Sequence, residues 1–240
     1  QAYSFGGVTF ETERTNGLSR LASLLLPRGT KTRSAQEIAT FFDSRGGSFS
    51  ASSGNNAIYL QAQALKDDFA DTMEVVSDML LNPAFPPEEL ELFRPQLLDA
   101  IGRISEAWRT ELFSYARSRF FRNSPYRFDD LGSAAVVAEA GSDDLAEFYH
   151  DLVTGPNTVV TVFGDVDAEL AESLVRRLFA RMPSQGADLP QVEPEPLRDR
   201  PELYILRKDP DRQAAGLAVT FPGMTVRNKL DRARMAVLDT

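Results

Sequence analysis

Side chains suited to acid–base or metal chemistry are few in this chain of 240 residues. It has one histidine, His150, and no cysteine. Two carboxylates, Glu147 and Asp151, lie within one helical turn of His150. Such a group could form a weak acidic metal site, but a histidine at the end of a helix is usually favoured there by the helix dipole. We therefore interpret His150 as a helix-end residue rather than a ligand.

The overall composition excludes several classes of function. The absence of cysteine excludes disulfides, thiolate zinc sites and cysteine nucleophiles, and one histidine excludes a mechanism that needs two imidazoles from this chain. The net charge of -9 disfavours binding to nucleic acid, because an acidic surface repels phosphates. No apolar run approaches the roughly 20 residues of a membrane span. The first residues lack the pattern of a signal peptide, which leaves the compartment open.

Hydrophobic periodicity predicts a chain of alternating helices and strands. Helices are expected at 17–26, 34–44, 69–81, 133–138, 142–151 and 168–181. Strands are expected at 2–11, 48–53, 57–65 and 157–164, the first of them buried. Asn16 is expected to cap the first helix, and Ser34 with Glu37 has the capping-box pattern at the second.

A longer helical stretch is predicted between residues 86 and 121. Pro95 lies inside it and should kink the helix or delay its start. The stretch carries several aromatic side chains, Trp108 and Phe113 among them. They could line a chamber, but core packing against the sheet is the default expectation for such residues.

Prolines divide the chain near its C-terminal end. Five of them fall between residues 183 and 201, which is typical of an extended linker. We therefore predict a first domain at 1–182, a linker at 183–200 and the beginning of a second domain at 201–240. Strands at 202–208 and 214–221 and a helix from 228 are expected in that second part.

A short repeated sequence suggests that the second domain is a copy of the first. Val8-Thr9-Phe10 and Val219-Thr220-Phe221 each precede a predicted loop and helix. The tripeptide alone carries little weight, but the shared order of elements makes a duplicated domain plausible.

A set of ordered segments carries a resemblance to a known family. The segments are GLSRLASLLLPRGT, SAQEIATFFDSRGGSFSASSGNNAIYLQAQALKDDF, LNPAFPPEELE, SPYR and PNTVVTVFGDVD. Together they span nearly all of residues 1–182, and the chain resembles the M16 metallopeptidases (insulinase, pitrilysin and mitochondrial processing peptidase). The resemblance implies an α+β fold in which a mixed, mostly antiparallel sheet carries helices on one face. It also implies that the chain starts one strand into the first domain and continues into a second, related one.

The resemblance also locates the zinc motif of the family, H-x-x-E-H, in this sequence. Arg20 stands at the first histidine, Ser23 at the glutamate and Leu24 at the second histidine, and the third ligand of the family matches Ala100. None of these side chains can replace a zinc ligand or the general base. The resemblance therefore implies no metal in this chain, and zinc only in a catalytic partner or in a missing half.

Two features in the matched region could still contact a peptide. Ser48, Phe49, Ser50 and Ala51 match the strand that pairs with the substrate backbone in catalytic relatives, although a partner could cover that edge. Arg20 could meet a carboxylate of a substrate or of a facing half, or it could be a solvated surface arginine of little energetic weight.

These features predict a non-catalytic half or subunit of an M16-type zinc peptidase. It would help to enclose an unfolded peptide and would associate with a catalytic half or subunit, in the bacterial periplasm or cytoplasm if the resemblance holds. The alternatives are a fragment of a longer zinc metalloendopeptidase whose zinc site lies outside this chain, a scaffold protein of the same fold, and an unrelated α/β binding domain with the same order of elements.

Overall fold

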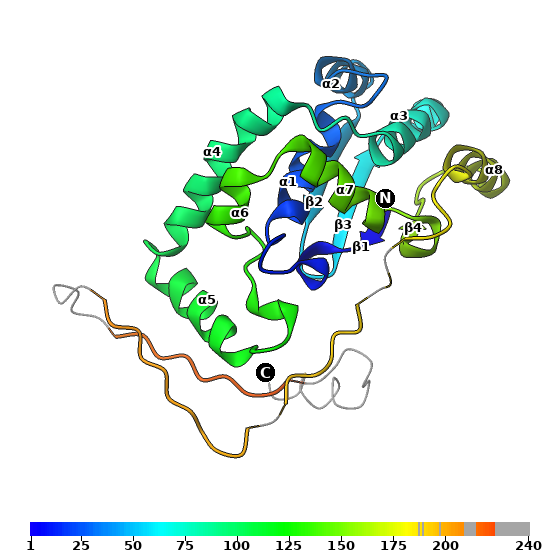
Figure 1. Cartoon of the computed structure of the whole chain (residues 1–240). Helices are drawn as coiled ribbons and strands as arrows, with labels where there is room; N and C mark the ends of the chain where they lie inside the picture. Colours follow the sequence, from blue (N-terminus) through cyan, green and yellow to red (C-terminus); the bar gives the residue numbers. More distant parts are fainter. Residues whose placement is uncertain (187, 189, 197, 209–214, 224–240) are drawn as a thin grey trace.

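The computed structural model describes residues 1–186, 188, 190–196, 198–208 and 215–223 (Figure 1). Its centre is an antiparallel sheet with the strand order β2-β3-β1-β4. The strands are β1 (Ala2–Phe5), β2 (Ser48–Ser53), β3 (Ala57–Gln63) and β4 (Thr158–Val160). Helices pack against this sheet, so the predicted α+β class is confirmed.

The sheet buries one face and leaves the other open. In β1, Ala2 and Ser4 are buried, and they pair in register with the buried Leu60 and Ile58 of β3. Helices α1 (Leu18–Leu25) and α3 (Phe69–Leu81) cover this face. Because side chains alternate along a strand, the residues between them point to the opposite, uncovered face.

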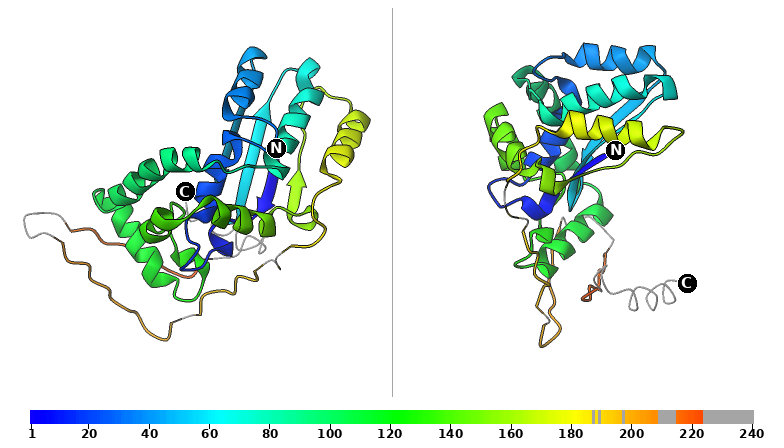
Figure 2. Two further views of the ribbon diagram at one scale, coloured as in Figure 1. Left: turned by 45° about the horizontal axis from the view of Figure 1, so that its top comes forward. Right: turned by 90° about the vertical axis from the view of Figure 1, so that its right-hand side faces the viewer.

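The remaining helices surround the covered face. Those that begin and end close to the predicted positions are α2 (Ala35–Ser44), α6 (Ala134–Glu139), α7 (Ser142–Leu152) and α8 (Ala168–Phe179). Figures 1 and 2 place α4 (Pro87–Ile104) and α5 (Trp108–Phe120) on the β2 side of the sheet, and α8 on the β4 side. The predicted capping box at α2 is confirmed, because Ser34 Oγ accepts from the backbone N–H of Glu37, and the Glu37 carboxylate accepts from the backbone N–H of Ser34 at 2.8 Å.

The first predicted strand is shorter than expected and only half-buried. It ends at Phe5 and gives way to a 3-10 helix at Gly7–Phe10. Tyr3 and Phe5 are 39% and 51% exposed, respectively. A run of apolar residues cannot distinguish a strand covered on both faces from one covered on a single face, and this sheet has helices on one face only.

The long helical stretch is two helices, α4 (Pro87–Ile104) and α5 (Trp108–Phe120). The break falls between them, whereas Pro95 lies within α4. Trp108 and Phe113 are 59% and 62% exposed, and no residue of α5 is buried. The expectation that these aromatic side chains pack in a core is therefore wrong, because α5 contacts α4 and the short 3-10 turn Pro125–Arg127 rather than the sheet.

The end of the predicted linker and the segment after it run along α5 (Figure 1). Arg198 donates to the last carbonyls of α5, those of Arg119 and Phe120, and Lys208 pairs with Glu111 at 2.7 Å. Within the described residues, 201–208 and 215–223 form no strand, so the strands predicted there are not observed. No neighbouring strand in that part of the structure offers them backbone partners. The helix predicted from 228 lies outside the described residues, and the predicted domain boundaries stay predictions.

Among the helices that the structure describes, none is both long enough and apolar enough to cross a bilayer.

Candidate functional site

Helix α1 carries the positions that match the zinc motif, and a glycine sets where it begins. Gly17 is the N-cap, with φ of 114°, a left-handed conformation that side chains disfavour. The predicted cap, Asn16, serves elsewhere. Its amide donates to the carboxylate of Glu11 at 2.7 Å and to the backbone carbonyl of Asp129 at 2.9 Å. The expectation that Asn16 caps α1 is therefore wrong.

A buried carboxylate takes over the capping of α1. Glu11 is almost fully buried, and its Oε1 accepts from the backbone N–H of Ser19 at 2.9 Å. Burial raises the pKa of Glu11, and hydrogen bonds from Asn16, Ser19 and Gly17 oppose that rise without cancelling it. Glu11 thus joins the start of α1 to the loop before it at the cost of a desolvated charge.

Replacing Glu11 with Gln should reduce the free energy of unfolding by about 1–2 kcal/mol. Both carboxylate oxygens of Glu11 accept a hydrogen bond, whereas the amide nitrogen of Gln cannot accept one. The loss should be larger at low pH. The pKa of Glu11 is higher in the folded than in the unfolded chain. The contribution of Glu11 to stability is therefore complete below a pH of about 4.5, and it is lost as the pH rises through the pKa of the folded chain. Urea unfolding of both proteins at several pH values measures this difference. A difference that grows with pH would contradict the account.

The four positions that the resemblance assigns to the zinc motif hold no imidazole or carboxylate. Ser23 is fully buried, and its hydroxyl donates to the carbonyl of Arg20 at 2.9 Å. Leu24 is half-buried and packs against the core, and Ala100 lies on α4, which packs against α1. The structure therefore brings together the two helices that carry these positions, but it places neither imidazole nor carboxylate there.

Zinc does not fit this donor set. An arginine repels a cation, and leucine and alanine have no donor atoms. Ser23 has its hydroxyl engaged by the backbone of its own helix. Elsewhere in the described part of the chain, no cluster of three or more His, Asp or Glu side chains is placed to hold a metal ion. The proposal that this chain binds no zinc rests on the chemistry of these residues and stays a prediction.

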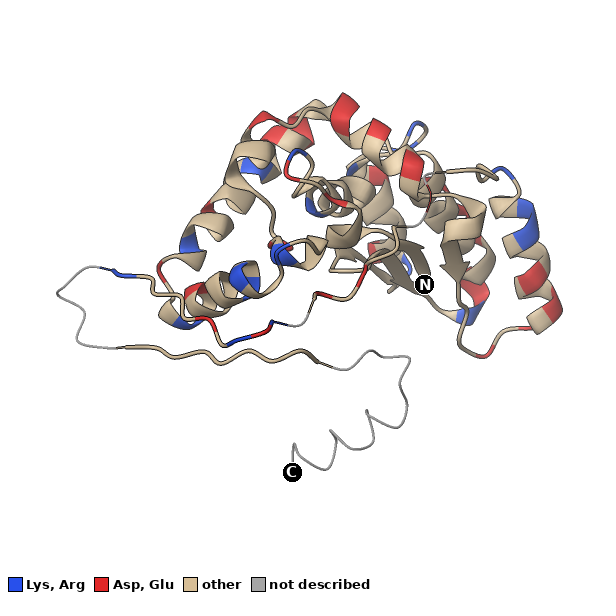
Figure 3. Ribbon diagram, turned by 60° about the horizontal axis from the view of Figure 1, so that its bottom comes forward, with Lys and Arg blue, Asp and Glu red and all other residues tan. Residues whose placement is uncertain are grey.

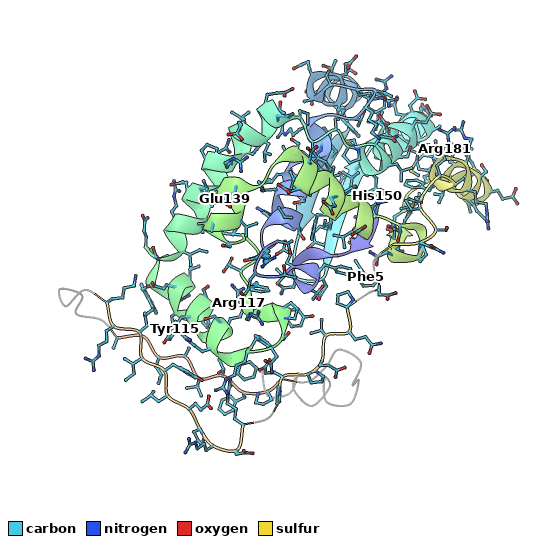
Figure 4. The ribbon with its side chains drawn as sticks, viewed as in Figure 1. Phe5, Tyr115, Arg117, Glu139, His150 and Arg181 are labelled. Atoms are coloured by element: carbon cyan, nitrogen blue, oxygen red, sulfur yellow. The ribbon has the colours of Figure 1, made fainter. Side chains whose placement is uncertain are left out.

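His150 lies on the exposed side of α7 (Figure 4). Its Nδ1 is 3.9 Å from the carboxylate of Asp151, and both side chains are largely exposed. A pair at this distance on the surface contributes little. The arrangement fits the interpretation of His150 as a helix-end residue.

The strand that matches the substrate-pairing strand of the family lies at an edge of the sheet. In the described structure β2 pairs only with β3. Ser48 and Ser50 are exposed, whereas Phe49 and Ala51 are half-buried on the helix side. One row of β2 backbone groups is thus without a strand partner among the described residues, which is the arrangement that addition of a peptide strand needs.

The open face of the sheet is uncharged, and on β1 and β4 it carries exposed apolar side chains. Tyr3 and Tyr59 meet edge to face with ring centroids 5.7 Å apart, and Val159 lies opposite Tyr3 on β4 and is 54% exposed. None of the four strands contains a charged residue, and Figure 3 shows the Lys, Arg, Asp and Glu residues on helices and loops. This face extends to Phe5 at the end of β1 (Figure 4).

Sequence reasoning missed two of these features. The signal for the open face was present, because Tyr3 and Phe5 alternate with the small residues Ala2 and Ser4. The role of Glu11 had no local signal. Its partners, Asn16 and Ser19, are brought to it by the loop between the 3-10 helix and α1.

Comparisons with known proteins agree with this geometry. The family model described as Insulinase (Peptidase family M16) matches residues 6–129, and the model described as Peptidase M16 inactive domain matches residues 140–240. The uncharacterized zinc protease YmxG of Bacillus subtilis is 24% identical over 220 residues, which cover 92% of this chain and 52% of the relative. The mitochondrial-processing peptidase subunit beta of Dictyostelium discoideum is 24% identical over 177 residues, or 73% of this chain and 38% of the relative.

Solved structures show the same fold. A peptidase M16 inactive domain from Pseudomonas fluorescens superposes with a TM-score of 0.75 at 18% identity, covering 81% of this chain and 47% of that one. The first half of the periplasmic protease PqqL from Escherichia coli gives a TM-score of 0.71 at 20% identity, over 82% and 44%. The chain spans about half the length of the relatives it matches. Because the first family model alone covers more than half of the sequence, the chain belongs to the M16 (insulinase) family of peptidases.

Proposed function

We propose that this chain is a non-catalytic part of an M16-type zinc peptidase system that holds an unfolded peptide against its sheet. The observation that carries the proposal is the sheet, which in the described structure has an unpaired β2 edge and an open, uncharged face. The helices packed beside it carry the positions assigned to the zinc motif, which hold Arg20, Ser23, Leu24 and Ala100. An extended peptide can pair with the edge through its backbone and lay apolar side chains on the face. Catalysis would then come from an M16-type half or subunit that carries zinc.

The open face suits a peptide in an extended conformation. Its aromatic and aliphatic side chains can pack against apolar side chains of a bound peptide, whatever the sequence of that peptide. Its hydroxyl and amide groups can form hydrogen bonds with the peptide without carrying a charge.

A binding experiment with one charged substitution tests the proposal. A fluorescent, unstructured peptide should bind the chain, and Phe5→Asp should weaken binding at least ten-fold, because it places a charge on the open face. Leu170→Asp on α8 is the matched control and should leave binding unchanged, since Leu170 is similarly exposed but lies on a helix. The peptide should remain intact when zinc is added. Absence of binding would favour a scaffold of the same fold, and cleavage would overturn the non-catalytic role.

A second candidate function follows from the fact that the chain covers only about half of the length of its relatives. The chain spans 52% of YmxG, which is named a zinc protease, so it could be part of a longer zinc metalloendopeptidase whose zinc site lies outside these residues. In that case the longer polypeptide alone should cleave the peptide, whereas the first candidate needs a separate catalytic chain. Mass spectrometry of the peptide after incubation distinguishes the two.

A further inference from the structure

Arg20 is a half-buried cation for which the described residues provide no partner. Its Nε is shielded from solvent and has no hydrogen-bond acceptor, and the guanidinium forms no ion pair among the residues that the structure describes. The shielded Nε has lost its hydration without gaining an acceptor, whereas the two terminal nitrogens of the guanidinium are not shielded and can still bind a ligand. A carboxylate beside this side chain would supply the counter-charge that the described residues do not.

The other half-buried arginines of the described chain show how unusual this is. Those that pair with a carboxylate are Arg33, Arg45, Arg94, Arg117, Arg127 and Arg198. Arg28 lies over the ring of Phe93, 4.7 Å from its centroid. Among the half-buried arginines in the described residues, Arg20 alone has neither kind of partner.

The position of Arg20 relates it to the edge of the sheet. Arg20 and Leu24, one helical turn apart, form the half-buried stripe of α1, and every other residue of the helix is buried. Helix α1 packs against β2, the edge strand that the proposed function assigns to the peptide. A group on that stripe can therefore meet a side chain or an end of a peptide held at the edge.

We propose that Arg20 binds a carboxylate of the enclosed peptide and gives the site a preference for acidic peptides; this inference rests on the proposed function. A planar guanidinium matches a carboxylate through two parallel hydrogen bonds, which an ammonium cannot reproduce. The chain has a net charge of -9, so it provides no long-range attraction for an acidic peptide. The preference must then come from a local contact, and the strands themselves contain no charged residue that could supply it.

The test uses the full chain and a matched set of fluorescent peptides that differ at one central position, Glu, Gln or Lys. Each is made with a free and with an amidated C-terminus, so that a side-chain carboxylate and a terminal carboxylate are distinguished. The Glu peptide, or the free C-terminus, should bind about ten-fold more tightly than its neutral counterpart. Arg20→Gln should abolish the ratio between the affinities for the acidic and the neutral peptide, and Arg20→Lys should retain part of it.

Arg14→Gln is the control, because Arg14 is an exposed arginine shortly before α1, and it should change nothing. Thermal melts establish that each variant is folded. Equal binding of all peptides, or a preference for Glu that survives in Arg20→Gln, would overturn the role of Arg20 while the proposed function stands. Failure of every peptide to bind would overturn the proposed function and this inference together.

Discussion

Replacing Phe42 with Ala is expected to destabilise the domain by about 3–5 kcal/mol. Phe42 lies on α2 and is 1% exposed. Its ring meets that of Phe41 edge to face with the centroids 5.2 Å apart, and its centroid lies 4.8 Å from that of Phe49 on β2. Truncation removes buried apolar surface and leaves a cavity between α2 and the edge strand, and both effects act in the same direction. Urea unfolding monitored by circular dichroism measures the loss.

The matched control for Phe42 is another phenylalanine, Phe163, which is 87% exposed. Phe163→Ala should change stability by no more than about 0.5 kcal/mol. Phe42→Ala should also weaken peptide binding, because Phe49 belongs to the edge strand that the proposed function assigns to the peptide. A loss of stability similar in the two variants would show that α2 is not part of the cooperative core.

Gly132→Ala is expected to cost about 3 kcal/mol through two separate effects. Gly132 has φ of 102°, which disfavours a side chain, and an added Cβ would lie 2.5 Å from the Cα of Gly17. That contact is between two backbones, so no side chain can move aside to relieve it. The substitution would push the loop before α6 away from the start of α1, the helix that carries the motif positions.

Two other glycines separate these effects. Gly46 has φ of 62° and open space around it, so Gly46→Ala should show only the conformational cost of about 1 kcal/mol. Gly102 lies in α4 with nothing near its added Cβ, and Gly102→Ala should be neutral or stabilising. Thermal unfolding of the three variants ranks them. A Gly132→Ala protein as stable as Gly46→Ala would contradict the close approach of the two backbones.

Local patterns predicted much of the fold because their causes are local. The capping box at Ser34 and Glu37 fixes the start of α2, and the turn between β2 and β3 follows from a Gly-Asn-Asn tripeptide. The start of α1 could not be predicted in this way, since Glu11 and Gly17 replace the expected Asn16 cap through contacts made by the tertiary fold. The exposure of α5 also depends on what packs against it, which its own sequence does not specify.

Some features of the candidate site can also be predicted from the sequence, whereas others depend on tertiary packing. The sequence alone predicts that Arg20, Ser23 and Leu24 stand at the ligand positions of the zinc motif, and this assignment stays a prediction. The burial of Ser23, and the absence of a partner for Arg20 among the described residues, emerge only from packing, because they depend on how α1 lies against β2 and α4. The open face of the sheet likewise results from the arrangement of helices on one side.

The most direct test of the central claim is the zinc content of the purified chain, measured by elemental analysis after exposure to zinc and dialysis. We expect near-zero metal per chain, because the positions that the resemblance assigns to the zinc motif carry an arginine, a serine, a leucine and an alanine. A zinc-binding M16 relative treated in parallel shows that the dialysis leaves a true site loaded. About one tightly bound zinc per chain would contradict the non-catalytic role.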